Sequence, residues 1–300
     1  MNPILRIFIG AVLLVLLLIA VDVYVGWSEL LTPWLLLSPE TIVIALILTF
    51  ATYMARAMRI YDYFYQQLKG RFAACLRLSL QHGLLNNFLP MRTGEISFPL
   101  LMSRQFDIPA KRSVPALLWF RIMDIHTLIL LGLVSLLQPQ LGNTLTVVLA
   151  VAWLAVPWVL LVGSRRLQQG VSNRQGRVFE LLIKLLHSLP HDRIKFYKTW
   201  AWTALNWFIK LAVFTFILMQ FIKLPGAAAL LGVIAGDLTS VLPVHGIAGA
   251  GTYEAGIVAA VLPFGAEASD ALKAAVNLHI FMLGGSILGG LVSLLLPARK

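Results

Sequence analysis

Six apolar stretches, each long enough to cross a lipid bilayer, are the feature that most constrains the fold of this chain. They cover residues 7–25, 41–58, 114–137, 144–162, 200–221 and 271–296. A hydrocarbon core of about 30 Å requires roughly 20 apolar residues in a helix. No small-x-small cleavage site follows the first stretch, so we expect it to remain as a span. The sequence therefore predicts an all-α polytopic membrane protein with about six transmembrane helices.

Composition excludes several other classes of protein. Of the 300 residues, 59% are hydrophobic and 12% are charged, whereas a soluble domain has about 25% charged residues, which argues against a water-soluble enzyme. The net charge of +11 is expected to mark orientation and to contact anionic lipids, and we expect no nucleic acid partner. Cys75 is the single cysteine, so there is no internal disulfide. With no metal-ligand spacing and no nucleotide motif, we expect no cofactor.

Two further apolar segments, near residues 72–106 and 227–263, are interrupted close to their middle by polar, Gly and Pro residues. The first break runs over residues 86–95 and the second over residues 242–254. Backbone groups without helical hydrogen bonds cost several kcal/mol each in lipid, so both breaks must be buried in protein or line a wet cavity. We interpret the two segments as re-entrant helical hairpins, each entering and leaving on one side.

The positions of Lys and Arg predict the orientation. The loops over residues 26–40 and 138–143 carry no Lys or Arg, and Lys223 and Lys273 are the only cations placed outside. The basic connections are residues 56–71, 104–112, 163–199 and 299–300. The positive-inside rule therefore predicts a cytoplasmic (inner) membrane protein with both termini in the cytoplasm. Counting either broken segment as a full crossing would place a cluster of cations on the wrong side.

The long basic stretch over residues 163–198 has an amphipathic middle. We expect it to lie along the cytoplasmic headgroups, with a solvated loop as the alternative.

The order of these elements repeats within a single membrane domain of residues 1–300. Residues 1–140 are predicted as span, span, hairpin, span from the cytoplasm, and residues 141–300 as the same series from outside. In secondary transporters, matching interrupted segments in two inverted halves point to a substrate site near the midplane. The predicted inverted repeat thus favours a translocator. The alternative is a duplication whose breaks only pack the bundle.

The first break contains both signs of charge. Arg92 and Glu95 lie three residues apart, preceded by the amides of Asn86 and Asn87. An ionised side chain at the bilayer centre costs about 2.5–3.5 kcal/mol on insertion scales, so this cation and anion are expected to pair or to meet a charged ligand. The start of the following half-helix would favour an anion such as a lipid phosphate. The alternative is an internal clamp that holds the hairpin shut.

Ionisable residues also occur within the long spans. Arg121 and Asp124 share one face of the third span, and we expect their partners in the hairpins. Arg56 and Arg59 share a face at the cytoplasmic end of the second span. We expect Arg56 to snorkel to the headgroups, whereas Arg59 is compatible with either environment. Lys210 lies within a later span and needs a partner or a cavity.

The second break is acidic. Asp237 and Glu254 flank it, with His245 between them. We expect Glu254 to balance an arginine such as Arg92 or Arg121, or to carry a proton if transport is proton-coupled. For His245 we expect an ordinary loop histidine.

These residues together resemble a known family. The motifs that carry the resemblance are Asn86-Asn87-Phe88-Leu89-Pro90-x-Arg92-x-Gly94-Glu95, Arg104, Arg121-Ile122-Met123-Asp124, Pro243 and Gly249-x-Gly251-x-x-Glu254. In this order they are similar to the transmembrane region of lysylphosphatidylglycerol synthases, the flippase-like membrane family, over almost the whole chain. Arg59 also falls where that family often carries an arginine, whereas Tyr253 stands where many members have one.

The resemblance implies movement of aminoacylated phospholipid between leaflets, or a place near lipid or polyprenyl-linked sugar pathways. We expect no soluble aminoacyl-transferase domain after the last span, and hence a stand-alone member of the family.

The combined prediction is a non-enzymatic, flippase-like protein that translocates a phospholipid or polyprenyl-phosphate-linked headgroup. Membrane lipids are its expected partners, together with a lipid- or glycan-modifying enzyme as a further candidate. Arg92 and Arg121 would receive phosphate, and carboxylates would balance them in the empty site. The expected substrate-binding residues are Arg59, Asn86, Asn87, Arg92, Glu95, Arg121, Asp124 and Glu254.

Two other functions fit the sequence. One is a membrane-embedded lipid or glycosyl transferase that uses Glu95, Asp124, His126 or Glu254 as a base. The other is a non-transporting subunit that anchors a soluble enzyme through residues 163–198.

Overall fold

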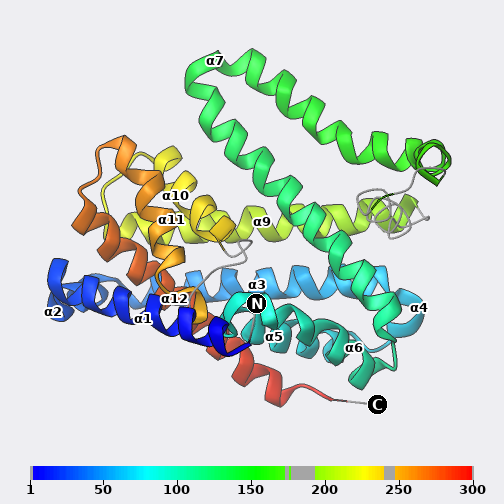
Figure 1. Cartoon of the computed structure of the whole chain (residues 1–300), viewed down its shortest axis with the longest axis horizontal. Helices are drawn as coiled ribbons and strands as arrows, with labels where there is room; N and C mark the ends of the chain where they lie inside the picture. Colours follow the sequence, from blue (N-terminus) through cyan, green and yellow to red (C-terminus); the bar gives the residue numbers. More distant parts are fainter. Residues whose placement is uncertain (1–2, 173–175, 177–192, 240–246, 299–300) are drawn as a thin grey trace.

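The computed structural model describes residues 3–172, 176, 193–239 and 247–298. These residues form helices joined by turns, and no strand occurs among them. Two long helices, α3 (Pro39–Tyr63) and α9 (Arg193–Phe221), lie side by side through the centre of the protein (Figure 1), and the other helices pack around them. The predicted all-α polytopic membrane fold is confirmed.

Six helices are long and apolar enough to cross a membrane. They are Pro39–Tyr63, Ala110–Leu137, Gln140–Val159, Arg193–Phe221, Ile247–Phe264 and Ala268–Leu295. Five of these cover all or most of the expected spans that begin near residues 41, 114, 144, 200 and 271, so those spans are confirmed as helices of sufficient length. The exception, Ile247–Phe264, lies in the second broken segment.

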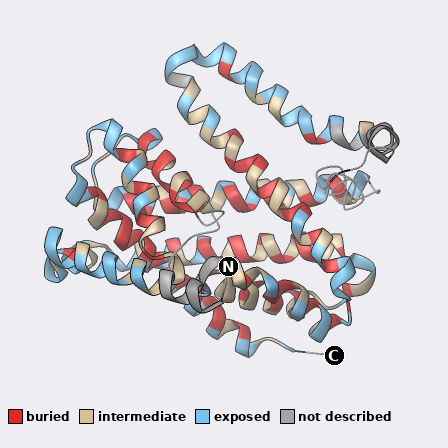
Figure 2. Ribbon diagram, in the orientation of Figure 1, coloured by how far each residue is buried: buried red, intermediate tan, exposed pale blue. Residues whose placement is uncertain are grey.

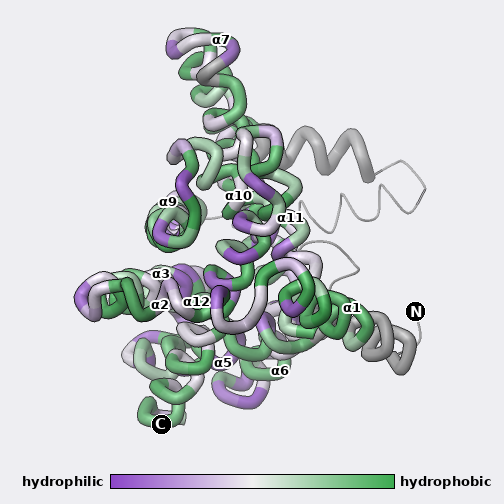
Figure 3. Tube along the Cα trace, turned by 90° about the vertical axis from the view of Figure 1, so that its left-hand side faces the viewer, coloured by the Kyte–Doolittle hydropathy of each residue, from purple (hydrophilic) through white to green (hydrophobic). Residues whose placement is uncertain are grey.

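The first expected span is α1 (Pro3–Tyr24), and it is followed at once by a second helix. We expected residues 26–40 to form a loop, but α2 (Trp27–Leu36) occupies most of that range. The two helices meet at an angle of 81°, and together they are apolar enough for one bent span. Gly26 makes the turn with φ 81°, a conformation that costs little without a Cβ. Figure 3 shows most of α1 in the hydrophobic colour.

The connection expected over residues 138–143 is a tight kink between two helical limbs. α7 (Ala110–Ser172) bends at Gly142, with φ 73° and ψ 171°, and turns back on itself (Figure 1). The imidazole Nε2 of His126 lies 2.9 Å from the carbonyl of Trp153, and the two rings stack at 5.2 Å, which ties the limbs together. Most of the second limb is exposed (Figure 2), and an exposed apolar helix of this length fits contact with acyl chains.

Both broken segments fold as two helices joined by a break. The first consists of α5 (Phe72–Phe88), η1 (Pro90–Ile96) and α6 (Ser97–Phe106), and it follows the short helix α4 (Tyr65–Leu68). The second consists of α10 (Gly226–Thr239), η2 (Ile247–Gly249), α11 (Thr252–Val261) and η3 (Leu262–Phe264), and it precedes α12 (Ala268–Leu295).

Helix length separates these arms from true spans. At 1.5 Å per residue, the 10-residue helices α6 and α11 are about 15 Å long, half of the hydrocarbon thickness. The candidate span Ile247–Phe264 is therefore not one continuous helix, because Ala248 and Gly251 both have positive φ and interrupt it. The expected helix-break-helix form is observed. Entry and exit on the same side of a membrane stay a prediction.

Glycine residues, which have no Cβ atom, allow the arms to approach closely. A Cβ on Gly94 would lie 2.4 Å from the Cα of Asn86 and from the carbonyl oxygen of Leu85, so the first break rests directly on the α5 backbone. On α10, a Cβ on Gly236 would lie 2.9 Å from Ile257 of α11. A small residue at this position lets the two arms of the second hairpin pack closely.

Two apolar cores flank the centre of the protein. One joins α3, α5, α6 and α7 around buried residues such as Phe98 and Phe120, and the other joins α9 to α12 around residues such as Ile217 and Ile257. Each core contains one of the broken segments. The two halves of the chain carry their elements in the same order, and the inverted symmetry between them stays a prediction.

Parts of three expectations lie outside the described residues. Residues 240–246, with Pro243 and His245, belong to the second break, and residues 173–175 and 177–192 make up most of the basic stretch. The side chain of Arg92 is also outside, although its backbone lies in η1.

Candidate functional site

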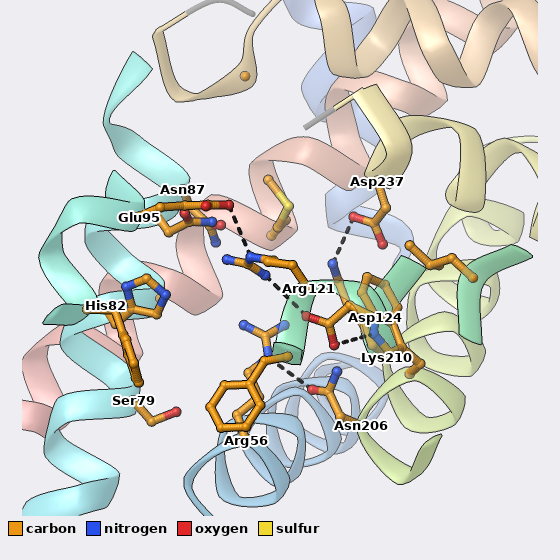
Figure 4. A pocket seen from close by; sticks show the side chains of 18 of the residues that line it. Arg56, Ser79, His82, Asn87, Glu95, Arg121, Asp124, Asn206, Lys210 and Asp237 are labelled. Atoms are coloured by element: carbon orange, nitrogen blue, oxygen red, sulfur yellow. Dashed lines mark hydrogen bonds and ion pairs between the residues drawn. The ribbon is translucent and has the colours of Figure 1, made fainter. Parts of the chain in front are cut away.

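A polar cavity of about 140 Å³ lies where the two apolar cores meet. Its walls come from both halves of the chain, and Figure 4 shows the charged side chains pointing into it. The polar lining side chains include Arg56, Arg59, Ser79, His82, Asn86, Asn87, Glu95, Arg121, Asp124, Asn206, Lys210, Asp237 and His279. Six of the eight predicted site residues are in this lining. The structure thus brings together six predicted residues that are spread over residues 59–124 of the sequence.

Asp124 is the centre of the charged network. Its Oδ1 accepts hydrogen bonds from Arg59 Nη1 at 2.6 Å and from Trp207 Nε1 at 3.0 Å. Its Oδ2 accepts from Arg121 Nη1 at 3.3 Å. Asp124 is only 5% exposed and Arg59 7%, and burial of a charge is tolerated when it is paired and hydrogen-bonded in this way. Arg59, for which the sequence left two environments open, is therefore an interior residue.

Arg121 connects the first break to α7. Its Nε lies 3.0 Å from Glu95 Oε1 in η1, while its Nη1 reaches Asp124 on its own helix. The side chains of Arg121 and Glu95 are 27% and 23% exposed, so this ion pair is open to the cavity. The prediction that Arg121 and Asp124 find partners in the hairpins is confirmed for Arg121. It is wrong for Asp124, which faces α3 and α9 and is bound there by Arg59 and Trp207. A ligand anion can compete with Glu95 for the same guanidinium.

Arg56 differs from the other cations of the cavity. Its Nε donates to Asn206 Oδ1 at 3.0 Å, and its guanidinium lies 5.4 Å from the centre of the Tyr53 ring. Within the described part of the chain, no carboxylate lies within ion-pair distance of it. We expected Arg56 to snorkel to the headgroups, and this expectation is wrong, because α3 turns the side chain toward α9. A cation held in a protein interior without a carboxylate partner is suited to bind an anion.

Lys210 has both the partner and the cavity that its position required. Its ammonium lies 2.8 Å from Asp237 Oδ1 of α10 and 4.9 Å from the centre of the Trp207 ring. This ion pair joins α9 to α10, the first arm of the second hairpin. Among the described lining residues, cations exceed carboxylates by one, and the difference is Arg56.

The α5 wall supplies uncharged polar groups. Asn87 Nδ2 donates to Ser286 Oγ of α12 at 2.7 Å, and His82 Nδ1 lies 2.9 Å from Ser97 Oγ of α6. In Figure 4, Asn87 and His82 lie on the opposite side of the cavity from Lys210 and Asp237. Asn86 lines the same wall. Amides and imidazoles here can donate to or accept from a bound headgroup.

Glu254 lies behind the cavity wall rather than in it. Its Oε1 is 2.5 Å from His279 Nδ1 of α12, and its Oε2 accepts from the Gly251 N–H at 2.8 Å. The expected pairing of Glu254 with Arg121 is wrong, because that arginine pairs with Glu95 and Asp124. The side chain of Arg92 lies outside the described residues. The predicted role of Glu254 as a proton carrier stays a prediction.

Several lining residues were not predicted from the sequence, although some of them had a usable signal. Asn206 and Lys210 are four residues apart on α9 and so share a face, as do Arg56 and Arg59 on α3. Polar residues at helical spacing inside an apolar span mark an interior face. His279 is a single histidine within the most apolar span, and it likewise marks an interior face. His126, named as a candidate base, is instead held by Trp153, outside the lining.

The described residues contain no group of three or more His, Cys, Asp and Glu side chains placed to hold a metal ion.

An all-α bundle with bilayer-length helices and a charged internal cavity defines a class, that of multi-pass membrane proteins with a polar interior site. Within this class, residues 4–290 match the family model of the lysylphosphatidylglycerol synthase TM region. The chain therefore belongs to this family of membrane domains, as its motifs indicated. No curated protein and no solved structure matches the chain.

Proposed function

We propose that the protein moves the phosphate-bearing headgroup of a phospholipid or polyprenyl-phosphate-linked lipid between the leaflets of the cytoplasmic membrane. The observation that carries this proposal is the charged cavity between the two hairpins, which contains Arg56 without a carboxylate partner among the described residues. A headgroup in lipid has no hydrogen-bond partners, whereas this cavity offers cations, amides and imidazoles.

The cations of the cavity have different roles in this proposal. Arg56 receives the phosphate first, because no carboxylate has to be displaced. Arg121 then exchanges Glu95 for a phosphate oxygen, since this pair is open to the cavity and guanidinium binds both groups in the same geometry. Arg59 and Asp124 are too buried to take part directly and hold the helices in place. The acyl or isoprenoid chains remain in the lipid.

The short helices η1 and η2 act as the moving parts in this proposal. η1 and η2 approach one another beside the cavity, and η1 is tied to α7 through the Glu95–Arg121 pair. Release of that pair on phosphate binding frees one break while the rigid helices stay in place. Alternating exposure of a midplane site by paired interrupted segments is the usual arrangement in secondary transporters. The protein is oriented with both termini in the cytoplasm and makes no covalent change in the lipid.

The test is reconstitution of the purified protein into vesicles of phosphatidylethanolamine and phosphatidylglycerol that contain fluorescent phosphatidylglycerol. Chemical quenching of the outer leaflet then measures the rate of lipid movement. We expect Arg56→Gln to slow movement by about tenfold or more, because a hydrogen bond to a charged group contributes roughly 1.5–3 kcal/mol. Arg56→Lys should restore part of the rate, since it keeps the charge but loses the planar fork.

The matched control is Arg112→Gln, which removes an exposed arginine near the start of α7. It should leave the rate unchanged. Equal rates for Arg56→Gln and the wild type would overturn the phosphate assignment. Covalently altered lipid would show an enzyme, and movement that appears only after addition of a soluble partner would show an anchoring subunit.

A further inference from the structure

His279 makes two polar contacts with opposite ends of its ring. Its Nδ1 lies 2.5 Å from Glu254 Oε1, and its Nε2 lies 2.9 Å from the carbonyl oxygen of Ala248. His279 is 3% exposed and Glu254 1%. The Tyr253 ring covers the imidazole, with the ring centres 4.6 Å apart. The imidazole therefore connects α12 to η2 and to the first turn of α11.

The number of protons in this arrangement follows from the contacts. A carbonyl oxygen only accepts, so Nε2 must carry a hydrogen to bond to Ala248. A second hydrogen must lie between Nδ1 and Glu254, on either group, for that contact to be a hydrogen bond. The pair therefore holds one proton more than a neutral imidazole and a carboxylate would. Without that proton, a ring lone pair faces an oxygen at one of the two contacts.

We propose that Glu254 and His279 form a proton-binding site whose occupancy holds the turn over residues 247–251 in place, and whose proton release lets this turn relax beside the cavity. The ligand is the proton itself, so the site would supply the coupling ion for the proposed lipid movement. This inference rests on the proposed function for its purpose. The proton site itself can be measured separately.

The segment held by this proton is poised to move. Ala248 has φ 55° and ψ 18°, a left-handed conformation that is disfavoured for a residue with a Cβ. The bond from His279 holds its carbonyl in place. Glu254 Oε2 also accepts from the Gly251 N–H, so the two ends of the turn are fixed by the same pair. Loss of the proton removes the Ala248 contact or the Glu254 contact and allows the turn to relax.

The proton has a path to water. Ala248, Gly249, Tyr253 and His279 all line the polar cavity. When the site empties, the proton leaves the imidazole for cavity water. The remaining hydrogen stays on Nδ1, where Glu254 accepts it. Nε2 then presents a lone pair to the Ala248 carbonyl, and the two groups repel one another.

The surrounding titratable groups contact partners other than Glu254 and His279. Those lining the same cavity are Arg56 and Arg59 from α3, His82 from α5, Glu95 from η1, Arg121 and Asp124 from α7, Lys210 from α9 and Asp237 from α10. Each of these carboxylates faces a cation, and His82 faces Ser97. Tyr253 is the neighbour in direct contact with the imidazole. Among the contacts of the described residues, Glu254 is the carboxylate of this region that faces a histidine instead of a permanent cation.

The first measurement counts the protons. In the full-length protein in nanodiscs, labelled with ¹⁵N-histidine, the His279 signal is identified by its loss in His279→Gln. The proposal expects the nitrogen shifts of a doubly hydrogen-bonded, proton-loaded ring at about pH 6 and a single lost proton on titration toward about pH 9. A His279 signal that is unchanged over this range, with one nitrogen unprotonated throughout, would overturn it.

The second measurement uses Glu254→Gln. The glutamine oxygen can accept from the Gly251 N–H while its amide donates to Nδ1, which leaves Nε2–H to bond to Ala248. This variant therefore imitates the loaded site and cannot release the proton. At about pH 9, hydrogen exchange of residues 247–254 should be about tenfold slower in Glu254→Gln than in the wild type, because the bond from Nε2–H to the Ala248 carbonyl is retained. At about pH 6 the two should agree.

Glu29→Gln, at an exposed glutamate of α2, is the matched control and should exchange like the wild type at every pH. Equal exchange of Glu254→Gln and the wild type at about pH 9 would refute the coupling to the break. If the proton and the break behave as expected but no fluorescent lipid moves, the proposed function fails and the proton site stands. If lipid moves at the same rate at every pH in both proteins, the lipid function stands and the coupling fails.

Discussion

Asp124 shows how a single carboxylate can organise a membrane-buried site. It lies on α7 and accepts hydrogen bonds from Arg59 of α3 and Trp207 of α9, so three helices depend on one side chain. Its second oxygen fixes Arg121, which reaches on to Glu95. In a low-dielectric interior each of these charges requires the others. Removal of one partner therefore costs more than the bond that is lost.

We predict that Asp124→Asn lowers the free energy of unfolding by about 3 kcal/mol, because Arg59 is left as a buried cation without its carboxylate. The measurement is denaturant unfolding in detergent micelles, followed by tryptophan fluorescence. Asp22→Asn, at an exposed position on α1, is the control and should unfold like the wild type. A change no larger than that of the control would mean that the network does not stabilise the fold.

Residue types in the site were largely predictable, but their partners were not. The cost of burying a charge singled out Arg121, Asp124 and Glu95 from the sequence, and the cavity contains all three. The same rule does not say which of several carboxylates a guanidinium meets. Glu254 illustrates the gap, because its partner His279 comes from another helix, 25 residues further along.

At the scale of elements, the two broken segments are distinguished by short helices and close packing. The arms α6 and α11 are too short to cross a bilayer. Glycines, which have no side chain, let the breaks pack directly against neighbouring helices. At Gly94, for example, η1 touches the α5 backbone. A break that faced lipid would leave its backbone groups without partners.

We predict that Gly94→Ala displaces η1 from α5, because the new Cβ would lie 2.4 Å from two backbone atoms that cannot rotate away. The expected result is a clear loss of folded protein and, in the fraction that folds, weaker contact between Glu95 and Arg121. Size-exclusion chromatography in detergent measures the first effect. Fluorescent lipid movement measures the second.

Gly284→Ala is the matched control, since a Cβ at that position of α12 meets nothing within 4 Å. It should give normal yields. If Gly94→Ala behaves like Gly284→Ala, the close approach of η1 to α5 does not exist in the membrane.

At the scale of the whole molecule, the polar cavity exists because two apolar cores meet without merging. Each core contains one hairpin, and the charged side chains gather at the boundary between them. Exposed apolar side chains cover much of the outer surface, including the second limb of α7 (Figure 2). The protein is thus apolar outside and polar at its centre, the reverse of a soluble domain.

We predict that the two ends of the second hairpin lie on the same side of the membrane. Cysteines are placed at Lys223 and at Glu267, both exposed, in a Cys75→Ser background that retains a donor for the Ala57 carbonyl. Both should react with a membrane-impermeant maleimide added to the outside of intact cells. A cysteine at exposed Arg112 should react only after permeabilisation. Opposite sides for Lys223 and Glu267 would make the segment a full crossing and would contradict the predicted orientation.

Local properties of the chain were sufficient for the class of fold, the long helices and the two interruptions. Helix length, apolar periodicity and the cost of unpaired backbone in lipid act over a few neighbouring residues, so they can be read along the chain. The family follows from the same motifs, and the match over residues 4–290 agrees with them.

Three-dimensional packing alone made the choice of partners. It placed Arg56 in the interior rather than at the headgroups, paired Arg121 with Glu95, and paired Glu254 with His279. The physical reason is that these contacts cross between helices distant in the sequence. Which side chains meet there depends on how each helix is rotated and how closely it packs, and both are set by the apolar cores around the cavity.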